Sequence, residues 1–380
     1  MVEQTAHIRW VIGPSPIAAN KNAGFAGGQR FPGEPDFRCG NFMEKSKVPA
    51  QAASLIDACR NELAKRVVGQ REMVDGLLTA LVAGGHILLE GVPGLAKTLA
   101  VKSLAEITGL DFKRIQFTPD LLPADLTGTL IWDQGKGAFS VRRGPVFANV
   151  ILADEINRAP AKMQSALLEA MEERQVTIGK TSYPLPDPFF VLATENPIEH
   201  EGTYSLPEAE LDRFMLKLLV GYPTPEEELS IVERGPPLSS GGTGKREPLS
   251  PVLDKAALAY LRRAADSVHV DEKIAEYIVS VVTATRPAAA RAAGPGKAKP
   301  AEGVYRYVSF GASPRASIAL HRCSRVFALF GGKTFVGPEE VKKAAFPVLR
   351  HRIVLSYEAE ADGLDADTVV SRILSHIPVP

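Results

Sequence analysis

The stretch His86-Ile-Leu-Leu-Glu-Gly-Val-Pro-Gly-Leu-Ala-Lys-Thr98 indicates the fold class. It opens with a short apolar run, which is typical of a buried strand, and a glycine-rich turn then leads into a helical pattern from about Lys97 to Thr108. A strand, a glycine-rich turn and a helix in this order are the context of a phosphate-binding loop. Gly91 and Gly94 let backbone N–H groups face a phosphate, and the helix N-terminus adds positive potential there.

Three residues of this loop need separate comment. Lys97 is placed to reach the β- and γ-phosphates of a nucleotide, and the hydroxyl of Thr98 is placed to bind Mg²⁺. Ala96 stands where the pattern GxxxxGK[ST] has its second glycine. Because this position lies where the helix begins, we expect a right-handed backbone conformation, which tolerates a methyl group. The alternative is a chance glycine-rich turn without phosphate chemistry.

Three further apolar runs predict strands of the same sheet. They cover Asn149–Asp154, Phe189–Thr194 and Met215–Val220, and a helical pattern after Pro160 separates the first two. Strands that alternate with helices predict a parallel sheet covered by helices on both sides. The predicted fold class is therefore α/β.

Asp154-Glu155 ends the first of these runs. A carboxylate at the carboxyl end of a strand beside the loop strand can hold Mg²⁺ through water, and the next residue can orient and deprotonate an attacking water. The alternative is an acidic turn after a buried strand. Following a phosphate-binding loop, the pair favours the catalytic interpretation.

Three other polar residues are candidates for the same site. Asn196 follows the second run, where its amide could bind a γ-phosphate or the attacking water, or form a turn before Pro197. Arg213 is either a surface cation paired with Asp212 or a group that stabilises transition-state charge in a neighbouring subunit. Arg315 either reaches the same phosphates from a second domain or is a solvated residue in the first turn of a helix.

Composition limits the class of protein. The chain has 380 residues, of which 45% are hydrophobic and 23% charged, and at roughly 150 residues per domain this predicts two or three domains. Lys+Arg and Asp+Glu are both 44, so the zero net charge argues against nucleic acid as a partner. No apolar run approaches the ~18 residues of a membrane span, and no secretory leader opens the chain. The three cysteines suit neither disulfides nor zinc, so the expected location is the cytoplasm.

Composition along the chain predicts four segments. Residues 1–48 are rich in Pro and Gly and predict a disordered tail; alternatively, Met43 is the true start of the protein. Residues 49–233 form the predicted α/β core, and residues 234–251 form a flexible linker. The predicted helical domain spans residues 252–380.

Start signals define the helices of that last segment. Asp254 and Asp271 are expected N-caps, and Pro314 and Pro338 are expected at first helical positions. The Ala/Gly/Pro/Lys stretch Pro287–Pro300 predicts a mobile loop between them.

In combination, these motifs resemble the MoxR family of AAA+ ATPases. The resemblance rests on VVGQ at 67–70, GVPGLAKT at 91–98, FTPDLLPADLTGT at 117–129, GPVFANVILADEINRAPAKMQSALLEAMEERQVT at 144–177, FFVLATENPIEHEGTYSLPEAELDRF at 189–214 and GASPRA at 311–316. It spans about residues 55–352 and implies an α/β ATPase core followed by a helical lid. Phe117–Val141 resembles the family's insertion in the second core helix, and Gln175–Pro188 resembles its hairpin before sensor 1.

The resemblance also implies a role for each candidate residue. It assigns Lys97 and Thr98 to Walker A, Asp154 and Glu155 to Walker B, Asn196 to sensor 1, Arg213 to a trans-acting arginine finger and Arg315 to sensor 2. It implies Mg²⁺ ligation by Thr98 and Asp154. The implied nucleotide contacts are Val68, Gly69, Gly91, Val92, Pro93, Gly94, Leu95, Ala96, Lys97, Thr98 and Leu99.

The activity we expect is Mg²⁺-dependent ATP hydrolysis that drives chaperone-like remodelling of a client protein. The resemblance implies a hexameric ring and a partner with a von Willebrand factor A domain, and metal or cofactor insertion into the client is a narrower form of the same activity. Two alternatives remain open. A nucleic-acid-dependent motor or transcription regulator predicts turnover stimulated by DNA or RNA, and a nucleotide-gated scaffold predicts binding with negligible hydrolysis.

Overall fold

The computed structural model describes residues 42–198, 203–233, 248–287 and 305–380. The predicted loop after Pro287 and most of the predicted linker lie outside these ranges, as do residues 1–41. Helix α1 (Phe42–Ala64) begins inside the stretch for which the sequence predicts a disordered tail, so residues 42–48 are helical instead. Glu and Lys in this stretch are good helix formers, which favours this extension of the helix.

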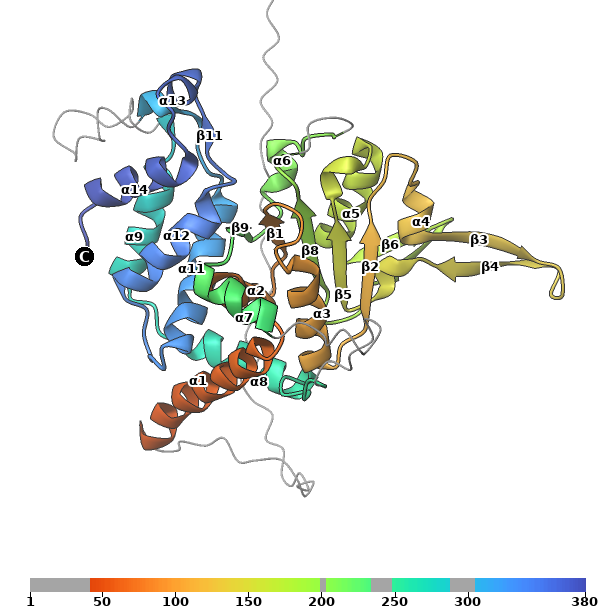
Figure 1. Ribbon diagram of the computed structural model, residues 1–380, viewed down its shortest axis with the longest axis horizontal. Coiled ribbons are helices and arrows are strands. Elements are labelled where there is room, and N and C mark those ends of the chain that lie inside the picture. Colours follow the sequence, from red (N-terminus) through yellow and green to blue (C-terminus); the bar gives the residue numbers. More distant parts are fainter. Residues whose placement is uncertain (1–41, 199–202, 234–247, 288–304) are drawn as a thin grey trace, which may run out of the picture. The chain divides into compact units, whose positions relative to one another are not determined.

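The central sheet is parallel and five-stranded (Figure 1). In spatial order its strands are β2 (Phe112–Gln116), β5 (Val150–Asp154), β8 (Phe190–Glu195), β1 (Ile87–Glu90) and β9 (Leu216–Leu219). Every neighbouring pair of these strands runs parallel. The carboxyl ends of the strands therefore meet at one edge of the sheet, where ligands bind in open α/β folds.

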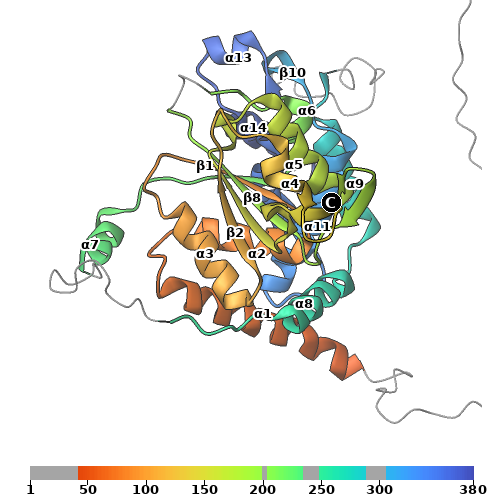
Figure 2. The ribbon, with the colours of Figure 1, turned by 90° about the vertical axis from the view of Figure 1, so that its right-hand side faces the viewer.

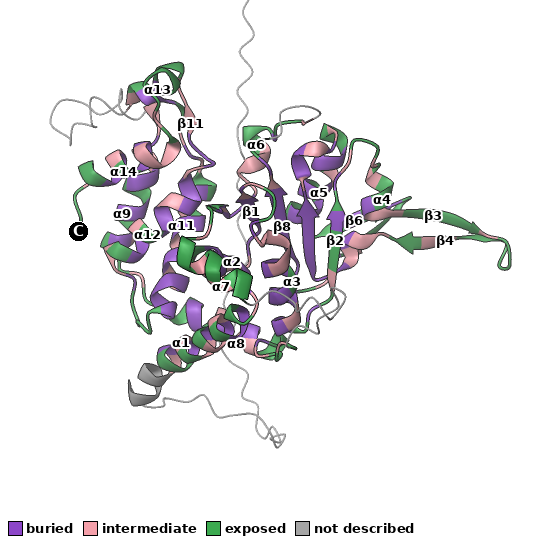
Figure 3. Cartoon of the chain, in the orientation of Figure 1, coloured by how far each residue is buried: buried purple, intermediate pink, exposed green. Residues whose placement is uncertain are grey.

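Each face of the sheet has its own hydrophobic core, because successive side chains of a strand point to opposite faces. Ile87 and Leu89 of β1 lie in a cluster with residues of α1, α2 (Arg71–Ala83) and α3 (Lys97–Thr108). Leu88 lies in a second cluster with residues of α5 (Ala161–Glu173). Strand β5 is buried along its whole length (Figure 3). Helices thus cover both faces (Figure 2), which confirms the predicted fold class.

Two antiparallel hairpins extend the core. The first hairpin consists of β3 (Gly128–Asp133) and β4 (Ala138–Arg143) and follows the short helix α4 (Pro123–Thr127). The second consists of β6 (Gln175–Ile178) and β7 (Thr181–Pro184). All but the last two residues of the first hairpin fall within the stretch that resembles the family insertion, and the second hairpin lies where the resemblance implies one. Figure 1 shows β3 and β4 reaching away from the sheet, and their side chains are largely exposed (Figure 3).

The chain beyond residue 252 is mainly helical and packs with the core in one compact unit. Its helices are α8 (Lys255–Ser267), α9 (Glu272–Thr283), α11 (Pro314–Phe330), α12 (Pro338–Leu349), α13 (Tyr357–Ala361) and α14 (Ala366–His376). The carboxylates of Asp254 and Asp271 accept hydrogen bonds from backbone N–H groups of α8 and α9, as expected of N-caps. A small antiparallel pair, β10 (Val308–Phe310) and β11 (Val354–Leu355), is an addition that the sequence pattern does not predict.

Strand β2 and helix α7 (Pro225–Glu233) have weak sequence signals. Strand β2 lies at the edge of the sheet and buries only Ile115. Its sequence therefore lacks the apolar run that would predict a buried strand. Helix α7 buries none of its residues. The remaining short elements are η1 (Pro145–Phe147), η2 (Ile156–Arg158), α6 (Glu208–Leu211) and η4 (Tyr305–Tyr307). Within the described part of the chain, none of the helices is long and apolar enough to cross a membrane.

Candidate nucleotide-binding site

The loop between β1 and α3 lies at the carboxyl edge of the sheet, as its sequence predicts. Lys97 is the first residue of α3, and its Nζ donates a hydrogen bond to the carbonyl oxygen of Gly91 at 2.5 Å. Burial lowers the pKa of Lys97, and the nearby carboxylates of Asp154 and Glu155 oppose this shift. The ammonium group therefore lies over the loop within the field of the predicted Walker B pair.

The backbone conformation of Ala96 differs from the one that the sequence predicts. Its φ of 58° and ψ of 13° place it in the left-handed region, so the expected right-handed conformation is wrong. The residue precedes the first helical residue and makes the turn into α3, which is a geometry that glycine adopts without steric cost. A side chain with a Cβ atom costs roughly 1–2 kcal/mol in this region. Gly91 is constrained differently, because a Cβ there would lie 2.7 Å from the carbonyl oxygen of Val220.

Asp154, the last residue of β5, is held by groups from both neighbouring strands. The Thr194 hydroxyl of β8 donates to its Oδ1 at 2.6 Å. Arg114 of β2 donates from Nε and Nη2 to its Oδ2, at 3.0 and 2.7 Å. These charge-assisted bonds fix the carboxylate toward the loop. The pattern of the sequence does not identify Arg114, because its strand lacks an apolar run; its position beside Asp154 follows from the β2–β5 register.

Glu155 directly follows β5 and has φ 56° and ψ 52°, a left-handed conformation that is uncommon outside glycine. Its backbone N–H donates to the Thr194 hydroxyl at 2.8 Å. Its Oε2 accepts a hydrogen bond from Gln116 Nε2 at 2.7 Å and lies 3.1 Å from Arg158 Nε. The carboxylate that the sequence predicts as the base is therefore bound to two protein groups. Gln116, like Arg114, is a site residue without a sequence signal.

Asn196 follows β8 and is buried. Its Oδ1 accepts a hydrogen bond from the backbone N–H of Ile198 at 3.2 Å, so it does form the turn that was the alternative interpretation. The same residue also lines the cavity next to the phosphate loop. Both interpretations of Asn196 are therefore compatible with its position.

A cavity of about 360 Å³ brings most of the predicted residues together. Its lining consists of Pro93, Gly94, Leu95, Ala96, Lys97, Thr98, Leu99, Arg114, Asp154, Glu155, Thr194 and Asn196. Gly91 and Val92 lie at the start of the loop, outside this lining. Gly69 lines a different cavity, between α1 and α2. The side chain of Glu227 in α7 lies against Gly69. Val68, its neighbour in the chain, lines neither cavity.

Oxygen atoms of the cavity suit Mg²⁺ better than a transition metal. Thr98 and Asp154 supply a hydroxyl and a carboxylate to the same space. Among the described residues, no group of three or more His, Cys, Asp or Glu side chains could hold a metal ion. Mg²⁺ commonly binds through one or two protein oxygens together with substrate phosphates and water. The donor set therefore fits a magnesium ion that arrives with a nucleotide.

Comparisons with known proteins agree with this site. A model of the ATPase family associated with various cellular activities (AAA) matches residues 86–216, and a model of the AAA lid domain matches residues 301–373. The chain is 46% identical over 324 residues to a protein named Chaperone MoxR1 from Mycobacterium tuberculosis, with 84% of this chain and 81% of that protein covered. The chain belongs to the MoxR family of AAA+ ATPases.

Two other relatives cover the chain to a similar extent. The MoxR-family chain is 44% identical over 317 residues to YeaC of Bacillus subtilis, which is named an uncharacterized protein, with 83% of this chain and 91% of that protein covered. It also matches the crystal structure of a candidate ATPase from Cytophaga hutchinsonii with a TM-score of 0.79 and 45% identity. That match covers 89% of this chain and 98% of the other.

The two arginines that the MoxR resemblance assigns to the nucleotide do not line the cavity at the phosphate loop. They meet instead at Glu172, near the end of α5. Arg315 Nη2 lies 2.7 Å from Glu172 Oε1, and Arg213 Nε lies 3.9 Å from Glu172 Oε2. The sequence offers Asp212 as an ion-pair partner of Arg213, but Arg213 approaches Glu172 and Asp212 pairs with Arg352. The structure brings Arg213 and Arg315 together with each other and not with Lys97.

Proposed function

We propose that this MoxR-family protein binds ATP with Mg²⁺ at the phosphate-loop cavity and hydrolyses its γ-phosphate. The observation that supports this most directly is the convergence of Lys97, Glu155 and Asn196 on one cavity. Lys97 begins the helix after β1, and the other two residues follow β5 and β8. A purely structural arrangement would not require a lysine, a carboxylate and an amide to meet there.

Each side of the cavity has a distinct task in this proposal. Backbone N–H groups of the loop bind the β-phosphate, and Lys97 exchanges its bond to the Gly91 carbonyl for phosphate oxygens. Thr98 and Asp154 would hold Mg²⁺. A bound Mg²⁺ would neutralise charge on the β- and γ-phosphate oxygens. Arg114 orients the carboxylate of Asp154, because it donates two hydrogen bonds to one oxygen.

Glu155 is the proposed general base, and Asn196 helps to orient the attacking water. In the structure the Glu155 carboxylate accepts a hydrogen bond from Gln116 and pairs with Arg158. Hydrolysis then requires at least one of these contacts to open, so that a carboxylate oxygen can take the proton of water. The proposal therefore places a conformational step of Glu155 before the chemical step.

Arg213 and Arg315 act on a nucleotide bound to a neighbouring subunit in this proposal. Neither arginine lines the loop cavity of its own chain, and both lie at Glu172, which supports this. Arginine placed on the γ-phosphate from a second subunit stabilises transition-state charge. A closed ring, which the MoxR resemblance implies to be a hexamer, would supply such a neighbour to every site.

We also propose that ATP turnover drives chaperone-like remodelling of a client protein in the cytoplasm. The relative named Chaperone MoxR1 supports this. A partner with a von Willebrand factor A domain and insertion of a metal or cofactor into the client rest on the family resemblance alone.

The experiment that tests the proposal measures ATP turnover against protein concentration, with size-exclusion light scattering on the same samples. We expect turnover per subunit to rise as the ring assembles. We expect Lys97→Ala to lose tight ATP binding and Glu155→Gln to bind ATP without hydrolysing it. ATP binding without turnover at any concentration would favour a nucleotide-gated scaffold, and strong stimulation by DNA or RNA would favour a nucleic-acid motor.

A further inference from the structure

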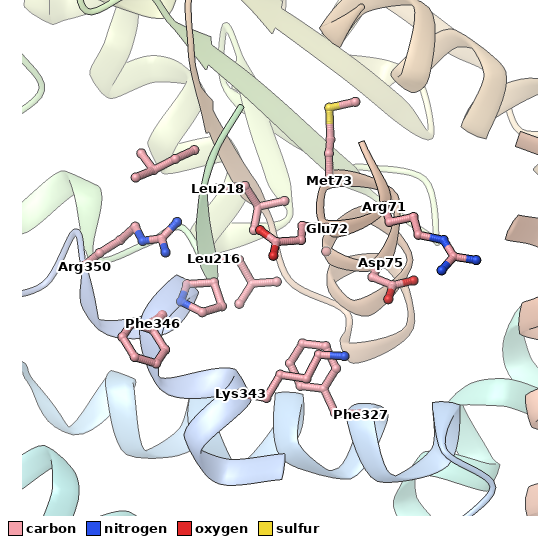
Figure 4. A pocket seen from close by; sticks show the side chains of 13 residues that line it. Arg71, Glu72, Met73, Asp75, Leu216, Leu218, Phe327, Lys343, Phe346 and Arg350 are labelled. Atoms are coloured by element: carbon pink, nitrogen blue, oxygen red, sulfur yellow. The ribbon is translucent and has the colours of Figure 1, made fainter. Parts of the chain in front are cut away.

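Three consecutive residues after α12 bind the core segment that contains Arg213. Arg350 Nη1 donates to the carbonyl oxygen of Lys217 at 3.3 Å, and His351 Nε2 donates to that of Phe214 at 3.0 Å. Arg352 contacts the residues on both sides of Arg213. Figure 4 shows Arg350 and Phe346 beside Leu216 and Leu218 of β9, around a cavity of about 410 Å³. The helical part thus joins the core along the strand that follows Arg213.

Arg352 uses all five of its N–H donors, four of them in bonds to the core segment. Its Nε donates to Asp212 Oδ1 at 2.7 Å. Its Nη2 donates to the carbonyl oxygens of Asp212 and Phe214, at 3.1 and 2.6 Å. Its Nη1 donates to those of Met215 and Val348, at 3.1 and 2.5 Å. Only 3% of the side chain is exposed, so these bonds form away from water, where each is stronger.

The second oxygen of Asp212 contacts the start of α11. Ser313 Oγ donates to Asp212 Oδ2 at 2.7 Å, while the same Ser313 hydroxyl accepts the backbone N–H of Arg315 as an N-cap. Arg315 Nη1 lies 3.9 Å from Asp212 Oδ2. One carboxylate therefore connects Arg352 with the helix turn that presents Arg315.

We infer that Arg352 is the positioning residue that holds Arg213 and Arg315 as one unit for a neighbouring subunit's phosphates. It fixes the backbone on both sides of Arg213 and, through Asp212 and Ser313, the first turn of α11. This inference rests on the proposed function, in which both arginines act in trans. Removing the Arg352 side chain leaves one oxygen of Asp212 and several backbone carbonyl groups without their donor, so we expect the segment to shift. Displacement of about 1 Å in a catalytic group can lower a rate about 100-fold.

The test compares Arg352→Gln and Arg352→Lys with Arg213→Ala in the full-length protein. We expect Arg352→Gln to lower kcat at least about tenfold while the KM for ATP stays within about twofold, because the nucleotide cavity is not touched. Arg352→Lys keeps the charge and loses the fork of donors, so we expect it to rescue kcat only partly. Lys333→Gln, which removes an ion pair with Glu340 elsewhere in the helical part, is the matched control and keeps kcat near that of the wild type.

Mixed rings separate positioning from loss of structure. Lys97→Ala subunits present intact arginines but do not bind ATP, whereas Arg352→Gln subunits bind ATP but misplace their arginines. We expect a mixture of Lys97→Ala and Arg352→Gln subunits to hydrolyse ATP faster than the sum of the two variants measured separately. A mixture of Lys97→Ala and Arg213→Ala subunits should show the same gain. If Arg352→Gln does not fold, Ser313→Ala takes its place, because it removes the hydroxyl that donates to the same Asp212 carboxylate. We expect this variant to lower kcat a few-fold.

The outcomes distinguish this inference from the proposed function. Loss of kcat in Arg352→Gln with recovery in the mixture supports the inference. Wild-type kcat in Arg352→Gln, or recovery with Arg213→Ala but not with Arg352→Gln, overturns the inference and leaves the proposed function intact. Wild-type kcat in Arg213→Ala overturns the trans-acting arginine itself, and the inference with it.

Discussion

Arg315 and Glu172 form an ion pair of 2.7 Å that joins the first turn of α11 to the last turn of α5. Arg213 approaches the other oxygen of the same carboxylate at 3.9 Å. A carboxylate between two arginines offsets their mutual repulsion and keeps both side chains in one place. In the proposed reaction both arginines bind a phosphate, and Glu172 is then not needed to neutralise them. We therefore expect this contact to change during turnover.

Alanine substitutions of the two arginines should therefore behave as changes to one unit. We expect Arg213→Ala and Arg315→Ala each to lower kcat about 10²- to 10³-fold, and the double variant to lower it little further, because groups that act together are not additive. Binding of ATP to the same subunit should be unchanged, since neither residue lines the cavity. Steady-state turnover and equilibrium binding of a fluorescent ATP analogue measure the two effects.

Arg322→Ala is the control, because Arg322 is exposed on the same helix as Arg315. A double variant whose loss equals the product of the two single losses would contradict a common role.

Gln116 should restrain Glu155. The 2.7 Å hydrogen bond from Gln116 Nε2 must open before the carboxylate can take a proton from water. We expect Gln116→Ala to raise basal ATP turnover a few-fold, since a hydrogen bond to a charged group contributes about 1.5–3 kcal/mol and part of this opposes the active position. Initial rates at saturating ATP check this. A lower rate in Gln116→Ala would show that the bond supports the active orientation instead.

Much of the phosphate site could be predicted from the sequence because its residues lie at the ends of buried apolar strands or in the loop that follows one. Lys97, Asp154 and Asn196 lie where a parallel sheet must bring strand ends together. Arg114 and Gln116 could not be found in this way, because they alternate along an edge strand with one buried residue. The pairing of strands, and not a local pattern, places them at the site.

The positions of Arg315 and Ala96 depend on geometry that spacing does not encode. Arg315 follows a recognisable helix start, but which subunit its side chain serves depends on how the helical part docks on β9. Ala96 is a small residue with good helix propensity, so its sequence context favours the right-handed conformation. The turn into α3 imposes the opposite sign of φ.

Buried histidines should make stability fall in mild acid. His86 accepts the backbone N–H of Val191 at Nδ1, and burial lowers the pKa of its ring to about 4. Burial and the neighbouring Arg352 also lower the pKa of His351 well below its usual value. Below a pH of about 6.5 these histidines become protonated in the unfolded chain but stay neutral in the folded protein. The free energy of unfolding therefore decreases as pH falls, until the pH reaches the folded pKa values.

Denaturant unfolding at several pH values measures this effect. Each histidine should contribute a slope that approaches about 1.4 kcal/mol per pH unit between its two pKa values. His86→Gln, whose amide does not titrate, should give a shallower dependence between pH 7 and pH 5 and the same dependence as the wild type above pH 8. An unchanged slope in this variant would show that His86 is not a source of the acid sensitivity.

Ala96→Gly should stabilise the protein, although glycine usually destabilises. At a φ of 58° glycine avoids the steric cost of a Cβ atom, which is roughly 1–2 kcal/mol, and this outweighs its greater freedom in the unfolded chain. We expect a net gain of about 0.5–1 kcal/mol in the free energy of unfolding. Ala275→Gly, in the interior of α9, is the matched control and should lose about 1 kcal/mol. Equal losses in the two variants would mean that Ala96 is not strained, and that its methyl group contributes to the loop in another way.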